Sequence, residues 1–217
     1  MKFKVTTVIL SVLVLSVWLI SCVDVPTNGP TPPDFRSEFR FASAAADLGD
    51  VGVSVDGQSI GNVSFLGEIA HADYPSGNRV VTLSNGDELR VPMTFDERAT
   101  VLILPLTAAV REFIKLVERR TFDAAATSTA RARIVHASPD AGDITTTLVG
   151  TDTTLVVSGS YRDVSNYASI PAGDYAYTAI STAGDTVTGT LTLANIRQTA
   201  VLAGSTGSLA LIGLLDN

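Results

Sequence analysis

The feature that most constrains the fold of this chain is an internal repeat. Three segments recur in the same order, and the spacing between partners drifts slowly, as insertions in loops would make it. The paired segments are Arg40–Val51 with Arg133–Ile144, His71–Gly77 with Tyr167–Gly173, and Ala99–Leu102 with Thr199–Leu202. We therefore expect two related domains, 38–122 and 131–217, joined by a linker over 123–130.

Each copy has the pattern of a β domain. In the second copy, short alternating runs rich in Val, Thr and Ile are separated by turn residues, which is typical of half-buried strands. The strands predicted there are Ala132–Ala137, Thr145–Val149, Thr154–Ser158, Asp174–Ile180, Thr186–Leu193, Thr199–Ala203 and Ser208–Leu214. Six or seven strands per copy predict an all-β protein of two tandem immunoglobulin/transthyretin-like antiparallel β-sandwich domains.

One segment, 108–120, gives two conflicting signals. Val110, Phe113, Ile114 and Val117 recur at helical spacing. Its counterpart in the second copy, Ser208–Leu214, has the pattern of a strand. Because the copies should share a fold, we predict a strand here.

The first residues have the features of an export signal. Lys2 and Lys4 precede an apolar run from Val8 to Ile20, which spans roughly 20 Å against the roughly 30 Å of a bilayer core. The sequence Leu19-Ile20-Ser21-Cys22 resembles the bacterial lipobox, in which the cysteine is acylated after the leader is removed. We therefore predict a lipoprotein signal peptide over 1–21 and a lipid-modified Cys22. An ordinary signal peptide or a short membrane anchor is the alternative.

The segment 22–37 contains four of the nine prolines of the chain. Proline density of this kind disfavours both helix and strand. We expect an extended tether that reaches up to roughly 45 Å and holds the folded body away from the membrane.

Composition excludes several function classes. A net charge of −7 disfavours nucleic-acid binding, which needs a positive surface. The single cysteine permits neither an intrachain disulfide nor a cysteine metal cluster, and two histidines are few for a zinc site. We expect no cofactor and no metal.

The residues that could carry chemistry lie mostly near His136. Ser138, Asp140 and Asp143 follow it closely, but a catalytic triad is normally assembled from separate segments, and no Gly-x-Ser-x-Gly motif is present. The interpretation that we favour is a strand end followed by a turn. We predict no catalytic residue, with an envelope hydrolase that uses His136 in a cleft as a remote alternative.

The matching acidic loops offer a second possibility. Asp47 and Asp50 in the first copy, and Asp140 and Asp143 in the second, flank a glycine. Such carboxylates could contribute to a calcium site, although Asp beside Gly is also ordinary turn chemistry. His71 has no clustered partners in the sequence, and no role is predicted for it.

The second copy also resembles a known family. The segments Ala130–Ala141, Val164–Tyr167 and Ile170–Tyr175 are similar to the domain of unknown function 4397, which opens with Arg, aliphatics and His-Ala-Ser-Pro-Asp-Ala. The first copy has Ser43 and Ala46 where that pattern has His and Pro. The resemblance implies a β-sandwich and an envelope location, and it implies no activity.

Together these features predict a non-enzymatic envelope lipoprotein. It would be anchored in a membrane through Cys22, at the periplasmic face of the outer membrane or at the cell surface, and act as a binding, adhesion or spacer module. Its partner could be a glycan or an envelope protein, and the ligand-binding residues stay open. The aromatic candidates for a binding face are Tyr161, Tyr167, Tyr175 and Tyr177, although the interpretation that we favour is that Tyr175 and Tyr177 cover one face of a strand. A self-assembling structural component that pairs through strand edges is the alternative.

Overall fold

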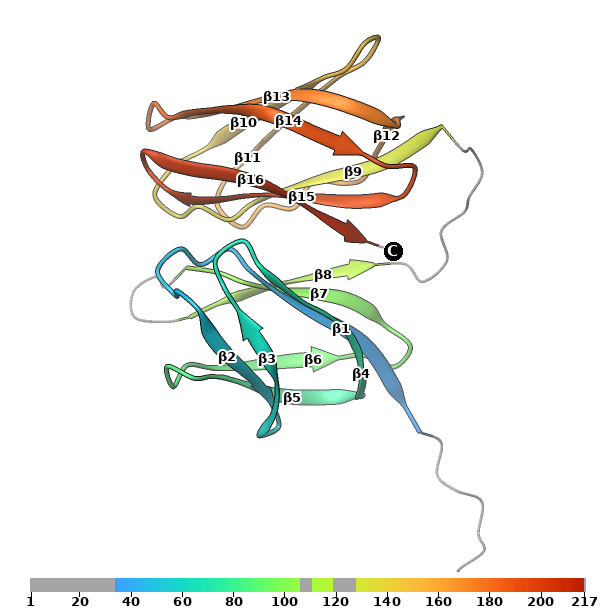
Figure 1. Ribbon diagram of the computed structural model, residues 1–217, viewed down its shortest axis with the longest axis vertical. Coiled ribbons are helices and arrows are strands. Elements are labelled where there is room, and N and C mark those ends of the chain that lie inside the picture. Colours follow the sequence, from blue (N-terminus) through green and yellow to red (C-terminus); the bar gives the residue numbers. More distant parts are fainter. Residues whose placement is uncertain (1–33, 106–110, 119–127, 217) are drawn as a thin grey trace, which may run out of the picture. The chain divides into compact units, whose positions relative to one another are not determined.

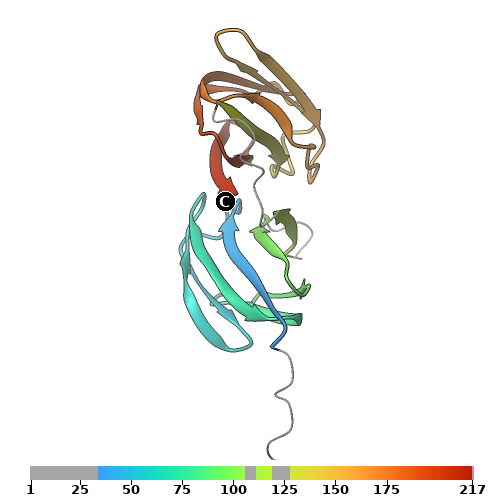
Figure 2. The same cartoon turned by 90° about the vertical axis from the view of Figure 1, so that its right-hand side faces the viewer.

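Residues 34–105, 111–118 and 128–216 are described by the structure, a computed structural model. They form sixteen strands and no helix, and all sixteen strands belong to the compact unit that begins at Phe35. Within these residues no helix is long and apolar enough to cross a membrane. The strands build two tandem β-sandwiches (Figures 1 and 2), so the predicted fold class is confirmed.

The first sandwich contains β1–β8 in two four-stranded sheets. Sheet 1 has the order β3 (Gln58–Val63), β2 (Val51–Val55), β5 (Gly77–Leu83), β6 (Glu88–Met93). Sheet 2 has the order β4 (Glu68–Pro75), β1 (Arg36–Ser43), β7 (Arg98–Ile103), β8 (Phe113–Glu118). Within the ambiguous segment, Phe113–Glu118 is thus a strand, as the repeat predicted.

The second sandwich repeats this arrangement with β9–β16. Sheet 3 has the order β12 (Ala168–Pro171), β9 (Thr129–His136), β15 (Arg197–Ser205), β16 (Ser208–Asp216). Sheet 4 has the order β11 (Thr154–Gly159), β10 (Ile144–Val149), β13 (Gly173–Ser181), β14 (Thr186–Leu193). Eight strands are therefore described in each copy, instead of the six or seven expected, because the short β12 is not evident from periodicity.

Not every strand pair is antiparallel. In sheet 2 the first strand, β1, lies parallel to β7, and in sheet 3 the equivalent strand β9 lies parallel to β15. All other pairs are antiparallel, including β1 with β4 and β9 with β12. The opening strand of each copy is consequently an inner strand of its sheet, with hydrogen-bonded neighbours on both sides.

Both of these opening strands start earlier than expected. Arg36 and Ser37, at the end of the expected tether, already pair with Pro75 and Tyr74 of β4. Likewise β9 begins at Thr129, inside the expected linker. Backbone pairing with a neighbouring strand decides these boundaries, and proline content does not report it. The remainder of the tether before Asp34, with Cys22 and the expected signal peptide, lies outside the described residues.

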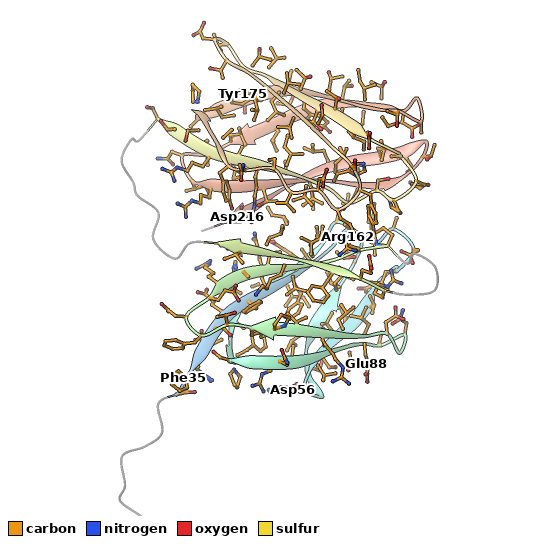
Figure 3. All side chains as sticks on the ribbon, turned by 180° about the vertical axis from the view of Figure 1, so that it is seen from behind. Phe35, Asp56, Glu88, Arg162, Tyr175 and Asp216 are labelled. Carbon is orange, nitrogen blue, oxygen red and sulfur yellow. The ribbon has the colours of Figure 1, made fainter. Side chains whose placement is uncertain are left out.

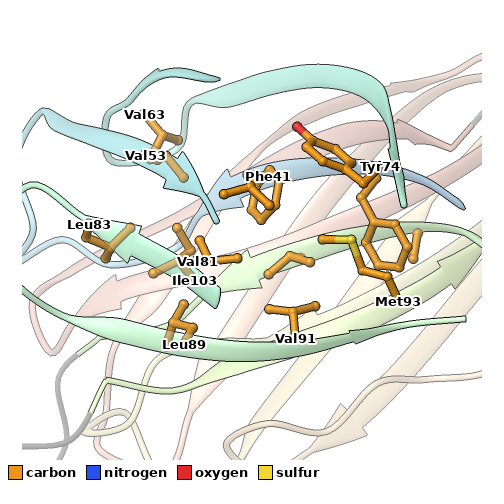
Figure 4. Packing of buried hydrophobic residues seen from close by; sticks show 14 of the residues in the cluster. Phe41, Val53, Val63, Tyr74, Val81, Leu83, Leu89, Val91, Met93 and Ile103 are labelled. Carbon is orange, nitrogen blue, oxygen red and sulfur yellow. The ribbon is translucent and has the colours of Figure 1, made fainter. Parts of the chain in front are cut away.

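The core is layered between the sheets. Between sheets 1 and 2, Phe41 packs edge to face on Tyr74, with ring centres 6.1 Å apart, among the buried aliphatic side chains shown in Figure 4. A second core lies between sheets 3 and 4. A third apolar cluster joins sheet 2 to sheet 3, through residues such as Leu102, Leu116, Val135 and Val201. The sheets thus follow one another in the order 1, 2, 3, 4.

Candidate functional site

The most unusual feature of the molecule is a cluster of buried charges where sheet 2 meets sheet 3. It starts from the arginine that opens each repeat. Arg40 on β1 and Arg133 on β9 are only 3% and 6% exposed. Each donates a hydrogen bond of 2.6 Å from Nε to a threonine hydroxyl on the parallel neighbouring strand, Thr100 for Arg40 and Thr199 for Arg133.

Each threonine also hydrogen-bonds to a buried acid of its own copy. The hydroxyl of Thr100 donates to Glu118 Oε1 at 2.5 Å, and the hydroxyl of Thr199 donates to Asp216 Oδ2. Both carboxylates have fully buried side chains. Each repeat therefore carries the same Arg–Thr–acid chain, built from its first strand and its last two described strands.

The two chains are joined across the boundary between the sandwiches. Arg40 Nη2 lies 2.8 Å from Asp216 Oδ1 and 3.4 Å from Glu118 Oε1, so one guanidinium binds an acid of each copy. In return, Arg133 donates to the backbone oxygen of Val117 at 3.2 Å. Asp216 lies at this boundary in Figure 3. Moving the sandwiches apart would break the pairing of Arg40 with Asp216 and the bond from Arg133 to Val117, so these contacts link one sandwich to the other.

Two further side chains of the cluster stand at matching repeat positions. His71 Nε2 lies 3.3 Å from Glu118 Oε2, and the hydroxyl of Tyr167 donates to Asp216 Oδ2 at 2.8 Å. The ring of Tyr167 is also covered by the guanidinium of Arg133, 4.6 Å from its centre. His71, for which the sequence predicted no role, is thus part of the cluster. Its alignment with Tyr167 was the available signal.

The two acids have opposite electrostatics. Burial by itself would raise the pKa of Glu118, but hydrogen bonds from His71 and Thr100 and the charge of Arg40 bring that pKa below its ordinary value. Glu118 is therefore a stable carboxylate in the folded protein.

For Asp216 the effects that raise the pKa exceed those that lower it. Burial raises its pKa, the nearby charge of Glu118 raises it further, and the contacts from Thr199, Arg133 and Tyr167 do not offset them. The same surroundings raise the pKa of Tyr167, mainly through burial and then through the negative charge of Asp216. Of the two acids, Asp216 is therefore the one that takes up a proton more readily.

The geometry corrects one part of the repeat alignment. Sequence similarity paired Ala99 with Thr199, but the structure makes Thr100 the equivalent of Thr199, because they occupy matching positions opposite Arg40 and Arg133. The difference is one residue. In a strand, a slip of one residue exchanges the two faces, so only the corrected register places both threonines on their arginines.

His136 lies elsewhere, beside a cavity of about 160 Å³ in the second sandwich. The cavity lies between sheets 3 and 4, and its lining residues include Ile134, His136, Thr146, Val157 and Asp163. In the first copy, Phe41 stands at the position of Ile134 and fills the core. The cavity has room for a few waters or a small ligand.

The ring of His136 is held by backbone groups. The amide of Ser138 donates to Nδ1 at 3.2 Å, so that nitrogen carries no proton, and Nε2 donates to the carbonyl of Gly142 at 2.7 Å. The hydroxyl of Ser138 donates instead to Asp140, at 3.2 Å. These residues form the turn that the sequence suggested, and no Ser–His–Asp relay is assembled among them.

The acidic loops are also engaged in structural contacts. Asp47 pairs with Arg111, at 3.0 Å. Asp140 accepts the backbone amide of Thr206, and Asp143 accepts the hydroxyl of Ser160. In the described parts of the chain, no three His, Cys, Asp or Glu side chains converge as a metal site.

The four candidate tyrosines do not form one surface. Tyr175 is 2% exposed in the core of the second sandwich, and Tyr177 packs against the same core. Tyr161 packs against the apolar cluster between sheets 2 and 3, and Tyr167 belongs to the charged cluster. These four residues therefore do not build one aromatic binding surface, and Tyr175 and Tyr177 lie on the inner face of β13.

The lipidation residue Cys22 lies outside the described residues, so its environment adds nothing to the sequence argument. No protein-family model matches the chain, and no curated protein matches it.

Proposed function

We propose that this protein is a lipoprotein of the bacterial cell envelope that works without catalysis, as a spacer or as a binding and adhesion module. Acyl groups on Cys22 would anchor it in the membrane, and the proline-rich tether would hold its two sandwiches clear of the lipid headgroups. The lipobox-like sequence supports the anchor, because several acyl chains hold a protein on a membrane where one would be marginal.

The charged cluster between the sandwiches is the observation that carries the spacer and presentation role. Domains joined by a linker usually move relative to each other unless their interface is large and apolar. Here an apolar layer surrounds a double Arg–Thr–acid chain, in which Arg40 and Asp216 cross the boundary at 2.8 Å. Such a joint would hold both sandwiches as one body, so that a surface on one copy keeps a fixed orientation to the other.

We also propose membership of the domain of unknown function 4397 family, on the motifs of the second copy. His136 and Ser138 of that motif hold the turn after β9 through backbone contacts. A structural role for the motif explains how the first copy can keep the fold with Ser43 in place of the histidine: Ser43 accepts the amide of Ala45, also two residues on, at 3.2 Å.

The anchor is tested by expressing the full-length chain and a Cys22→Ala variant in a bacterial host with an alkyne-labelled palmitate. The wild type is expected to incorporate the label and to sediment with membranes, and C22A is expected to do neither. A Ser16→Ala variant, changed within the apolar run, serves as the control and should behave as wild type. If C22A still fractionates with membranes as a processed protein, the lipid anchor is wrong.

The self-assembly alternative is tested by measuring the molecular mass of the full-length chain in detergent at a series of protein concentrations. A spacer or a binding module is expected to stay monomeric over the range. Growth into larger species would favour the structural component that pairs through strand edges.

A further inference from the structure

The cavity in the second sandwich has a buried hydroxyl group on its wall. Thr146 on β10 lies on the inward side of the strand, as Ile144 and Leu148 do, and it is 1% exposed. Its hydroxyl makes no hydrogen bond to another residue in the described part of the chain. An unpaired buried hydroxyl is destabilising. We therefore expect Thr146 to meet a hydrogen-bonding group inside the cavity.

The other polar side chains beside the cavity core are already engaged. Both ring nitrogens of His136 are held by the backbone contacts described above. The hydroxyl of Ser165 accepts a backbone amide at 2.9 Å and donates to a backbone carbonyl at 3.1 Å. The hydroxyl of Ser158 lies 2.8 Å from that of Thr145, on the exposed side of the sheet. Among the described residues that line the cavity, Thr146 therefore offers the hydroxyl that a ligand can bind.

The remaining lining is apolar inside and acidic at the rim. Four aliphatic side chains form the inner wall: Ile134, Ile144, Val157 and Leu202. Asp163 and Val164 also line the cavity and are exposed, so it reaches solvent beside them. The carboxylate of Asp163 is held there by the amide of Ser160, at 2.8 Å. Its negative charge disfavours an anionic ligand, and the apolar wall disfavours any charged group.

The fold does not require a hydroxyl at this place in the core. The match of β2 to β10 makes Val53 the equivalent of Thr146, as Phe41 is the equivalent of Ile134. Val53 and Phe41 are both fully buried in the core of the first sandwich. At the cavity, the second copy thus has a smaller side chain in place of an aromatic ring and a hydroxyl in place of a methyl group.

We propose that this cavity binds a small neutral molecule with an apolar body and one hydroxyl group, of the size of phenol. An apolar cavity of about 150 Å³ is large enough for benzene, so the volume of about 160 Å³ suits a single ring. The ring would pack on the aliphatic wall while its hydroxyl pairs with that of Thr146. A site that hydrogen-bonds a ligand hydroxyl discriminates against the analogue without it, because its own polar group is then left unpaired.

The test is equilibrium dialysis of the full-length chain, with the same detergent on both sides of the dialysis membrane. Phenol, toluene and benzoate serve as probes of similar shape. Wild type is expected to bind one phenol per chain and to bind toluene about tenfold more weakly, as the loss of one hydrogen bond implies. Benzoate should not bind measurably, because of its charge.

Three variants locate the site and identify its polar group. Thr146→Val removes the hydroxyl at nearly constant shape, so phenol should bind about tenfold more weakly while toluene binding is kept. Ile134→Phe fills the cavity and should abolish binding of both probes. Thr147→Val, changed on the opposite side of the same strand, is the matched control and should bind both as wild type does. Circular dichroism verifies the fold of each variant.

Three results would overturn the inference. They are no phenol bound by wild type above the detergent blank, equal phenol affinity in T146V and T147V, or undiminished phenol binding by I134F, which would place the site elsewhere. The inference rests on the binding role proposed above and is independent of the anchor. Cys22→Ala should therefore lose membrane association and keep phenol binding, so failure of either proposal is distinguishable.

Discussion

Replacing Asp216 by alanine should be the most damaging single change at the joint between the sandwiches. The carboxylate accepts from Arg40 at 2.8 Å, from Tyr167 at 2.8 Å and from Thr199, and its side chain is fully buried. Alanine removes the acceptor of all three hydrogen bonds at once. Arg40 keeps Glu118 as a partner, while Arg133 loses its only nearby acid in the cluster, 3.6 Å away.

The expected cost follows from the buried geometry. Removing one member of a buried pair costs about 3–5 kcal/mol, mainly because the remaining charge stays desolvated. By contrast, Arg162 and Glu112 form a partly exposed pair that also crosses between the sandwiches, at 2.9 Å, and it should contribute less than about 1 kcal/mol. Arg162 is labelled in Figure 3. Glu112→Gln is therefore the matched control for Asp216→Ala.

The assay is urea unfolding at neutral pH, followed by circular dichroism and by the fluorescence of the tyrosines. Wild type and E112Q should unfold in one transition at similar midpoints. D216A should show a lower midpoint or two separate transitions, since the sandwiches would no longer unfold as one unit. If D216A and E112Q shift the free energy of unfolding equally, the cluster is not what joins the sandwiches.

Three further predictions concern the acid, the cavity and a hairpin. In the unfolded chain Glu118 has its ordinary pKa of 4.5, whereas in the folded protein its pKa is lower, so the free energy of unfolding of wild type falls as the pH drops from the first pKa through the second. Glu118→Gln removes this carboxyl, so its free energy of unfolding should fall less over the same pH range. Urea titrations at a series of pH values measure the difference. Ile134→Phe introduces at the 160 Å³ cavity the residue that the first copy has there, Phe41. At about 24 cal/mol per Å³ of cavity filled, the larger side chain should raise the free energy of unfolding by roughly 0.5–1 kcal/mol. A decrease would mean that the cavity walls are too rigid to accept the ring. Gly204→Ala places a Cβ 2.2 Å from the backbone oxygen of Ser208, at φ +113°, and should lower the free energy of unfolding by about 2–4 kcal/mol. Gly207→Ala, at φ +80° with open space around the Cβ, should lower it by only about 1 kcal/mol. Equal shifts of the melting temperature would contradict this reasoning.

The repeat and the alternating runs were sufficient to predict two sandwiches and most strands of the second copy, because they report which side chains face a core. They could not predict that β1 lies parallel to β7, since the partner of a strand depends on contacts far along the chain. For the same reason the local match of Ala99 to Thr199 was off by one residue, and only the contact with Arg133 identifies Thr100 as the equivalent.

The charged cluster was hidden from the sequence for a related cause. Its members are isolated polar residues in the sequence: Glu118 and Asp216 end β8 and β16, where exposed polar residues are common, and His71 lies in the middle of β4. They are unusual because they are buried between two sandwiches. Burial at a domain boundary produces no periodic pattern of polar and apolar residues in the sequence. The alignment of His71 with Tyr167 and the recurrence of Arg40 as Arg133 were the only indications.

The inner position of β1 has a consequence for the order of events during folding. Its neighbour β7 lies about sixty residues further along the chain, as the contact between Arg40 and Thr100 shows, and the partner of Arg40 at Asp216 is 176 residues away. Proteins dominated by contacts between distant residues fold slowly, over milliseconds to seconds. A chain of this topology would therefore stay unfolded during the export proposed above, and we expect the joint between its sandwiches to form last.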